Sequence, residues 1–157
     1  MEFETAAIHA GQDPDPTTGA VTVPIYATST YAQEAPGKHA GYEYSRTDNP
    51  TRRALAEALS ALEGANNAGA VITASGMAAT ALLGHFLKPG DHVVLPDDAY
   101  GGTYRYFARV LSEHGIGFSA ADMTSPEGIA AAMTDTTKLV WVETPTNPLL
   151  RLVDIPG

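Results

Sequence analysis

Short apolar segments alternate with helix-length segments along the last two thirds of this 157-residue sequence, and this alternation limits the fold more than any other feature. Residues 92–95 and 139–143 are almost entirely apolar, as in strands buried on both faces of a parallel sheet. Strands that alternate with helices predict an α/β fold, a mostly parallel sheet with helices on both faces. The expected strands are residues 70–74, 92–95, 116–120 and 139–143, and the expected helices are 77–87, 103–114 and 126–133.

The regular region opens with residues that favour a helix boundary. Asn49 is a favourable N-cap, and Pro50 suits the first helical turn. Leu55 and Leu59 recur at helical spacing, and Gly64 suits the position just after a helix. We therefore expect a helix between Asn49 and Gly64.

The first fifty residues differ from the rest. They are rich in proline and show no sustained periodicity, and only residues 21–31 look extended. A floppy tail is one interpretation, but four tyrosines in this stretch argue against it, because disordered tails are poor in aromatic residues. Long irregular segments are often functional or contact a partner. The sequence therefore predicts an extended N-terminal arm over residues 1–50 and an α/β domain that begins at residue 51 and runs to 157.

Composition narrows the classes of function. The net charge of -9 has the wrong sign for wrapping nucleic acid or docking on anionic lipid. The absence of cysteine excludes a disulfide framework and a thiol nucleophile. The N-terminus lacks the pattern of a signal peptide, and no apolar stretch approaches the ~20 residues of a membrane span. We expect a soluble, cytoplasmic protein with no nucleic-acid or membrane partner.

One candidate ligand segment runs from an expected strand into an expected helix. Ligands of open α/β sheets bind beyond the carboxyl ends of the strands. Here Ser75, Gly76 and Met77 place backbone N–H groups at the positive end of a helix dipole, which suits a phosphate. Tight packing of small residues is the alternative. Neither the Walker loop nor the glycine fingerprint of dinucleotide-binding domains is present.

Three further segments carry candidate ligand-binding side chains. Tyr100 precedes two glycines, which let the backbone approach closely while the ring offers its face; a surface turn is the alternative. Asn147 lies between prolines in a stiff turn, where its amide orients a ligand atom or bonds its own backbone. In the arm, Arg46 suits a phosphate, with the Tyr44 hydroxyl as a second donor, or is a solvated surface charge.

Seven segments, taken together and in this order, indicate a protein family far more specifically than any one of them does. They include Tyr-Gly-Gly-Thr and Glu-Thr-Pro-Thr-Asn-Pro. Their sequences and order resemble the Cys/Met-metabolism family of enzymes that depend on pyridoxal 5'-phosphate (PLP). The resemblance implies the fold-type I transferase architecture, a PLP cofactor and an amino-acid substrate. The segments are residues 5–11, 24–31, 42–51, 75–79, 90–94, 100–103 and 143–148.

The resemblance also implies roles for the candidate residues in the domain. Gly76 and Met77 give N–H groups to the cofactor phosphate, and Ser75 lies beside them. Tyr100 stacks on the pyridine ring and, as a catalytic residue, helps activate the incoming amino acid. Asn147 lies near the phenolic oxygen of the ring.

Two residues of the arm take the remaining role. By the same resemblance, Tyr44 and Arg46 reach into the phosphate site of a neighbouring subunit. The implied assembly is a homodimer or homotetramer whose sites are shared between subunits. No metal site is expected, because the five histidines are scattered without metal-ligand spacing.

The lysines of this sequence do not lie in the sequence setting that the family has around its PLP-binding lysine. PLP chemistry needs a lysine for covalent attachment and an acidic group on the ring nitrogen. Lys38, Lys88 and Lys138 are the only lysines, and none has the family's Ser-x-Thr-Lys setting. In the family, both groups follow the point where this sequence stops. We therefore expect the N-terminal part of a longer enzyme, with an incomplete large domain, no C-terminal domain and no activity of its own.

The implied activity is that of cystathionine γ-synthase, a γ-replacement that joins an activated homoserine ester to cysteine. Because no residue separates synthase from lyase, γ-elimination by a cystathionine or methionine γ-lyase is the alternative. A non-catalytic partner subunit that binds the phosphate without the lysine stays open. So does a nucleotide-binding α/β domain, which the missing glycine fingerprint disfavours.

Overall fold

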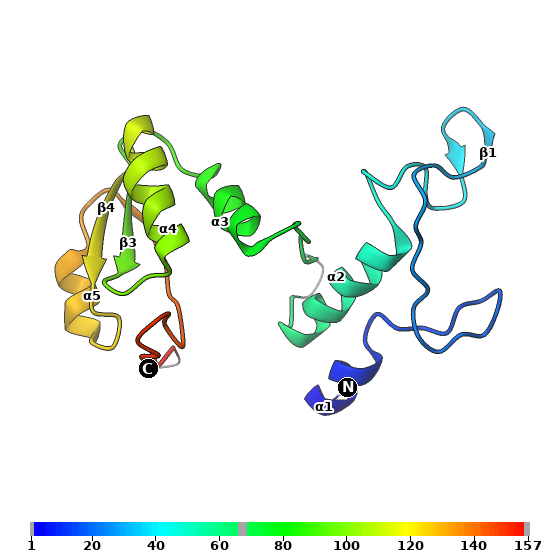
Figure 1. Ribbon diagram of the computed structural model, residues 1–157, viewed down its shortest axis with the longest axis horizontal. Coiled ribbons are helices and arrows are strands. Elements are labelled where there is room, and N and C mark those ends of the chain that lie inside the picture. The colour runs from blue at the N-terminus through cyan, green and yellow to red at the C-terminus, as the bar shows by residue number, and fades with distance from the viewer. Residues whose placement is uncertain (1, 66–68, 156–157) are drawn as a thin grey trace. The chain divides into compact units, whose positions relative to one another are not determined.

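The computed structural model describes residues 2–65 and 69–155, and its chain forms two compact units. The first is Met1–Ile72 and the second is Thr73–Gly157. Figure 1 shows their elements in chain order. Within the described residues, no helix has both the length and the apolar character needed to cross a membrane.

A three-stranded parallel sheet forms the centre of the second unit. Its central strand is buried along its whole length, as its apolar sequence predicts. The two outer strands pair in parallel with it, in the order β4-β3-β5. The strands are β3 (His92–Pro96), β4 (Gly117–Ala121) and β5 (Thr137–Val140).

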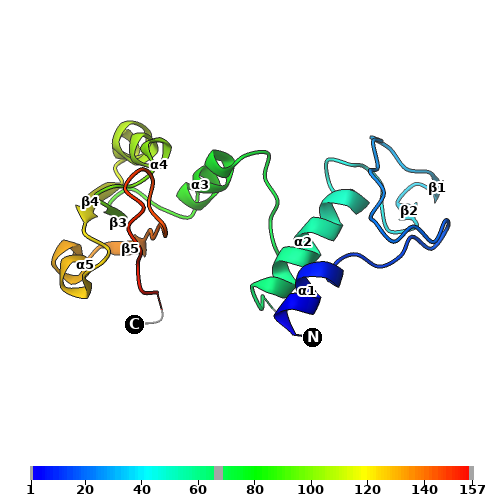
Figure 2. The same cartoon turned by 60° about the horizontal axis from the view of Figure 1, so that its bottom comes forward.

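Helices cover both faces of this sheet. Val93 and Leu95 of β3 pack against Phe107 and Leu111 on one face, whereas Val94 packs with Ile129 on the other. Figure 2 shows the strands between α4 and α5. The predicted α/β architecture, a parallel sheet with helices on both faces, is therefore confirmed for the described part of this unit. The helices of this unit are α3 (Gly76–Gly84), α4 (Gly101–Tyr106) and α5 (Pro126–Ala132).

Three predicted elements are present with altered boundaries or geometry. The helix expected at residues 77–87 is α3, which begins at Gly76 and ends at Gly84. The helix expected at residues 103–114 starts as α4 and continues as the π-helical segment η1 (Phe107–Leu111) and the 3-10 segment η2 (Ser112–His114). The strand expected at 139–143 is β5, which begins two residues earlier and ends at Val140. After β5, the Trp141 N–H still donates to the Val94 carbonyl at 2.8 Å, and Trp141 and Glu143 carry side chains of the candidate site.

The strand predicted at residues 70–74 is wrong. This segment has no regular secondary structure, and the Val71 side chain is 74% exposed. No strand among the described residues pairs with it. An apolar run forms a strand only where a neighbouring strand supplies hydrogen-bond partners for its backbone, and the pattern of residues alone does not show that neighbour.

The first unit is built around α2 (Pro50–Leu62). Both predicted boundaries are confirmed: the Asn49 side chain accepts a hydrogen bond from the Thr51 N–H, and Gly64 has a φ of 62°. Helix α1 (Phe3–His9) lies beside α2 in both ribbon views.

The first fifty residues contain more regular structure than expected. Helix α1 was not indicated by periodicity, because its seven residues are too few to establish one and only Ala6 is buried. A hairpin is also present, and both of its strands are exposed, so no apolar alternation marks them. Its strands are β1 (Gln33–Ala35) and β2 (Lys38–His39).

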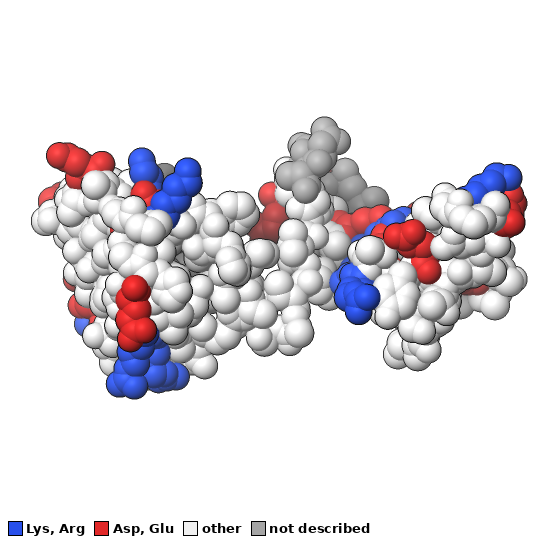
Figure 3. All heavy atoms as spheres, turned by 90° about the horizontal axis from the view of Figure 1, so that it is seen from above, with Lys and Arg blue, Asp and Glu red and all other residues white. Residues whose placement is uncertain are grey.

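Charged side chains are distributed in small groups. Figure 3 shows small groups of acidic and basic residues, several of them side by side, among uncharged surface on the face that it presents. Ion pairs such as Arg151–Asp97 and Lys38–Glu34 join neighbouring charges. Charges of both signs therefore occur on the face that this figure shows.

Candidate functional site

An open pocket in the second unit collects residues from α3, the start of α4 and the segment after β5. Its volume is about 800 Å³. Of the seven predicted site residues, Ser75, Gly76, Met77 and Tyr100 line it. The carboxyl-end position expected for a ligand in an open α/β sheet therefore holds a pocket here. The full lining is Ser75, Gly76, Met77, Ala79, Thr80, Leu83, Tyr100, Thr103, Trp141 and Glu143.

The N-terminus of α3 supplies hydrogen-bond donors to this pocket. Ser75 is the N-cap, and its hydroxyl accepts from the Ala78 N–H at 3.1 Å. The Ser75 carbonyl accepts from Ala79. The N–H groups of Gly76 and Met77 lie too early in the helix to have intrahelical acceptors, and no other acceptor reaches them in the described part of the chain. They are therefore free to bind an anion at the positive end of the dipole.

Tyr100 is held at the pocket through its backbone. It is the N-cap residue of α4, with a 46% exposed side chain. Its N–H donates to Glu143 Oε2 at 2.7 Å, and the other carboxylate oxygen accepts from Trp141 Nε1 at 3.0 Å. The Glu143 carboxylate therefore joins the segments that follow β3 and β5, and both of its oxygens are engaged.

Gly102 provides the space for the Tyr100 ring. A Cβ atom at this glycine would lie 2.4 Å from Tyr100 Cε1 and 2.8 Å from Met77 Sδ. From sequence, Gly101 and Gly102 are expected to let the backbone approach a ligand closely. In the structure, the ring of Tyr100 uses the space at Gly102 and lies next to the start of α3.

Asn147 lies on a turn that is fixed by its neighbours. Thr146 is 2% exposed, and its hydroxyl donates to Asp98 Oδ2 at 2.6 Å and accepts from the Arg151 N–H at 2.9 Å. The Arg151 guanidinium donates to Asp97 at 2.9 Å, and this bond raises the pKa of Arg151 above its ordinary value. Asn147 itself is exposed and does not line the pocket.

Tyr44 and Arg46 belong to the first unit. The Arg46 guanidinium carbon lies 4.8 Å from the centroid of the Tyr44 ring, so the cation stacks on the ring face. Tyr44 forms an isolated antiparallel bridge with Thr30. The Arg46 side chain is exposed, and that of Tyr44 is half-buried. The phenol and the guanidinium predicted to act together are therefore adjacent.

Sequence reasoning gave no role to Glu143 or Trp141. Glu143 belongs to one of the seven segments, but its importance comes from Tyr100, which lies 43 residues away. An acidic residue shortly after a buried strand, at the edge where ligands bind, is the signal that could have identified it. Trp141 carries a weaker signal, because a buried strand often ends in an aromatic residue.

The residues present fit a phosphorylated aromatic ligand such as PLP. Free N–H groups at the start of α3 match the phosphate, and the ring of Tyr100 matches an aromatic face. Ala79 and Leu83 add apolar wall. Pockets for cofactors commonly combine such walls with a few placed donors.

Known proteins are similar to this chain over nearly its whole length. Residues 4–157 match the family described as Cys/Met metabolism PLP-dependent enzyme. The chain is 60% identical to a probable cystathionine gamma-synthase of Herpetosiphon aurantiacus over 98% of its own length and 47% of that protein's. It is 51% identical to cystathionine gamma-lyase of Homo sapiens, and covers 38% of it.

A solved structure gives the same result for the fold. The crystal structure of metB from Corynebacterium glutamicum superposes with a TM-score of 0.89 at 49% identity, over 98% of this chain and 40% of that one. The chain thus spans less than half the length of each of these relatives. The match over residues 4–157 shows that the chain belongs to the Cys/Met metabolism family of PLP-dependent enzymes.

Proposed function

We propose that this chain forms the phosphate-binding and ring-binding part of a PLP enzyme of sulfur amino-acid metabolism. One observation carries the proposal: the free N–H groups of Gly76 and Met77 and the ring of Tyr100 line a single pocket. An anion site beside an aromatic face is what a phosphorylated pyridine requires. A metabolic enzyme of this kind also fits a location in the cytoplasm.

In this proposal, each pocket residue has a defined task. Gly76 and Met77 donate their N–H groups to the phosphate, and Ser75 keeps the first turn of α3 in place through its cap bond. Tyr100 stacks on the ring, and its phenol helps activate the amino group of the substrate. The cofactor, when bound, supplies an electron sink for the carbon atoms of the substrate.

We propose that Asn147, Tyr44 and Arg46 act with these residues. The stiff turn of Asn147 suits an amide that orients the phenolic oxygen of the ring. The stacked Tyr44 and Arg46 are suited to a phosphate held by a second copy of the chain, so that a homodimer or homotetramer shares its sites. Residues 1–50 then serve as the arm of this assembly, and residues from 51 onward as part of the PLP domain.

The lysine that links the cofactor is, in this proposal, not one of the three in this sequence. Lys38 lies in β2 of the first unit, Lys88 precedes the turn into β3, and Lys138 lies near the start of β5, away from the carboxyl edge. None of the three lines the pocket. The relatives are more than twice as long as this chain, which leaves room in such enzymes for the lysine elsewhere.

We propose γ-replacement by a cystathionine γ-synthase as the reaction. The 60% identity to a probable synthase supports it. The γ-elimination of a γ-lyase is the second candidate, supported by the 51% identity to the human enzyme. Assays of the whole enzyme distinguish them: cysteine-dependent formation of cystathionine supports the synthase, and release of ammonia and an oxo-acid alone contradicts it.

A fluorescence titration tests the binding proposal on the chain itself. Trp141 is the single tryptophan and lines the pocket, so its emission reports on this site. The probe is pyridoxine 5'-phosphate, which has no aldehyde and therefore cannot react with any lysine. We expect saturable quenching that inorganic phosphate reverses and that pyridoxine without its phosphate does not reproduce. A response to NAD, with none to this probe, would favour a nucleotide-binding domain.

Two substitutions at one glycine isolate the backbone donor. Gly76→Pro removes the N–H, and proline suits the first helical position after the extended Ser75. Gly76→Ala keeps the N–H, and its Cβ meets no atom within 4 Å. We expect Gly76→Pro to bind the probe about tenfold more weakly than the wild type does. Gly76→Ala is expected to bind it with an affinity near that of the wild type. Equal affinities would contradict the role of this N–H group.

A further inference from the structure

The side-chain amide of Asn49 joins three segments of the first unit. Its Oδ1 accepts from the Thr51 N–H at 2.9 Å, which is the N-cap bond of α2. Its Nδ2 lies 3.0 Å from the Tyr26 carbonyl oxygen, 3.0 Å from Ser45 Oγ and 3.3 Å from the Tyr31 hydroxyl. Because an amide has two N–H donors, the two shorter contacts satisfy it.

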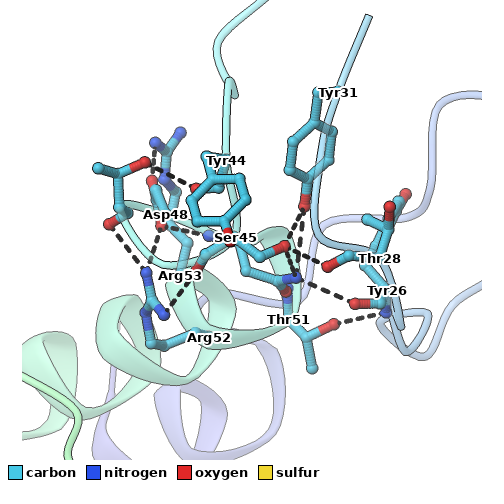
Figure 4. Close-up of polar contacts among 11 residues, drawn as sticks. Tyr26, Thr28, Tyr31, Tyr44, Ser45, Asp48, Thr51, Arg52 and Arg53 are labelled. Carbon is cyan, nitrogen blue, oxygen red and sulfur yellow. Dashed lines mark hydrogen bonds and ion pairs between the residues drawn. The ribbon is translucent and has the colours of Figure 1, made fainter.

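The next two residues of α2 hold the same segments. Thr51 Oγ1 donates to the Pro24 carbonyl at 2.9 Å and accepts from the Tyr26 N–H at 2.9 Å. The Arg52 guanidinium donates to the Ser45 carbonyl at 3.0 Å. Figure 4 shows the bonds between Thr51 and Tyr26 and between Arg52 and Ser45 at the first turn of α2. The start of this helix is therefore an attachment point for two segments that have little secondary structure of their own.

One of these segments carries the stacked pair of the arm. Ser45 lies between Tyr44 and Arg46, and its N–H donates to the Ser29 carbonyl at 2.8 Å. The Ser45 hydroxyl donates to the Thr28 carbonyl. With its backbone paired and its hydroxyl held by Asn49, this residue fixes the direction of the neighbours on either side.

We propose that Asn49 is a positioning residue that holds the Tyr44–Arg46 segment so that the phenol and the guanidinium present together to a phosphate group. This inference rests on the phosphate role proposed for that pair. Capping alone needs only an acceptor, and serine or aspartate caps a helix as well as asparagine does. Only an amide both accepts from the Thr51 N–H and donates to Tyr26 and Ser45.

Substitutions that keep an acceptor for the cap and remove the two amide N–H donors test this proposal. Asn49→Ser retains an acceptor for the Thr51 N–H, and Asn49→Asp also places a carboxylate against the Tyr26 carbonyl oxygen. In both variants we expect hydrogen exchange of the Ser45 N–H to accelerate by about tenfold or more, measured by NMR. The N–H of Arg53, which donates to the Asn49 carbonyl at 2.9 Å, is the internal reporter of the helix start and is expected to keep its rate.

A spectroscopic signature separates positioning from general stability. The ring current of Tyr44 shifts the NMR resonances of the Arg46 side chain above it, and this shift is expected to shrink in Asn49→Ser. Ser125→Ala, which removes the N-cap bond of α5, is the matched control and should change neither signal.

Two outcomes bear on the proposal in opposite directions. If folded Asn49→Ser and Asn49→Asp keep wild-type exchange at Ser45 and a wild-type Arg46 shift, the proposal is overturned. If both signals change while Arg46→Ala leaves PLP retention of the assembled enzyme intact, the positioning is supported and the phosphate role of the pair is wrong.

Discussion

The backbone N–H of Tyr100 donates to Glu143 Oε2 at 2.7 Å, across 43 residues of sequence. Tyr100 makes no side-chain cap bond for α4, and its own N–H is instead bound by a carboxylate from the segment after β5. A negative charge at this position is also favoured by the helix dipole. The same carboxylate binds Trp141, and the two strand ends therefore share one anchor.

Removing this carboxylate should loosen the aromatic side of the pocket. In Glu143→Ala, the Tyr100 N–H and the Trp141 indole both lose an acceptor, so we expect unfolding to become about 1–2 kcal/mol easier and pyridoxine 5'-phosphate to bind about tenfold more weakly. Denaturant titration and Trp141 fluorescence measure the two effects. Glu127→Ala is the control, because that exposed side chain bonds only to Ser125 within the described residues. Wild-type affinity in Glu143→Ala would show that Tyr100 does not depend on the anchor.

A methyl group at Gly102 should displace the Tyr100 ring. The added Cβ meets Tyr100 Cε1 at 2.4 Å and Met77 Sδ at 2.8 Å, so both side chains must move. We expect Gly102→Ala to lower the free energy of unfolding by about 1–3 kcal/mol. In the same fluorescence titration, its affinity for pyridoxine 5'-phosphate should be lower than that of the wild type. Gly117→Ala is the matched control, since its nearest contact is His92 Cδ2 at 3.5 Å. If Gly102→Ala binds the probe as tightly as wild type, the ring position is unimportant for binding.

The regular elements that sequence predicted correctly are those defined by their own residues. The apolar run of β3 and the capping chemistry of Asn49 and Gly64 are local features, and each lies where the sequence indicated. Likewise α5 starts at Pro126, with Ser125 as its N-cap. Local propensity and burial agree at these positions, and such agreement is what makes an element readable from sequence.

Features that depend on distant partners were not predictable in the same way. Residues 70–74 have the composition of a strand but no partner strand in the described chain. The anchor at Glu143 depends on how β3 and β5 lie side by side. The π-helical turn at Phe107–Leu111 depends on packing under the sheet, where Phe107 and Leu111 are buried. For the site, the sequence motifs predicted the N–H donors of Gly76 and Met77 and the ring of Tyr100. They did not predict that Glu143 holds Tyr100 in place.

The Asp15–Tyr26 hydrogen bond should make two ionisations depend on each other. The Thr18 N–H is the main cause that lowers the pKa of Asp15, and the Tyr26 hydroxyl contributes by donating to it at 3.0 Å. The same bond is the main cause that raises the pKa of Tyr26 above 10.0, because the bonded phenol keeps its proton. Asp15→Asn should therefore bring the pKa of Tyr26 down toward its ordinary value, measured by NMR titration of the phenol.

The pH dependence of stability follows from these signs. A lowered carboxyl pKa contributes stability that is fully present above the ordinary value of 3.8 and is lost as the pH falls through the lowered pKa. The raised phenol pKa contributes stability below pH 10.0 that is lost as the pH rises through the raised value. Asp15→Asn should remove the part of the acidic loss of stability that Asp15 contributes and reduce the part of the alkaline loss that Tyr26 contributes. An unchanged Tyr26 titration in this variant would contradict the coupling.

The buried hydroxyl of Thr146 should contribute more to the free energy of unfolding than an exposed hydroxyl does. It donates to Asp98 Oδ2 and accepts from the Arg151 N–H, and valine fills the same volume with neither capacity. Thr146→Val leaves both groups without this partner, so we expect a loss of about 2 kcal/mol in the free energy of unfolding, measured by urea titration. Thr124→Val is the matched control: its hydroxyl also bonds an aspartate, Asp122, but is exposed, and the expected loss is under about 1 kcal/mol. Equal losses in the two variants would mean that burial of the Thr146 hydroxyl does not strengthen the turn that carries Asn147.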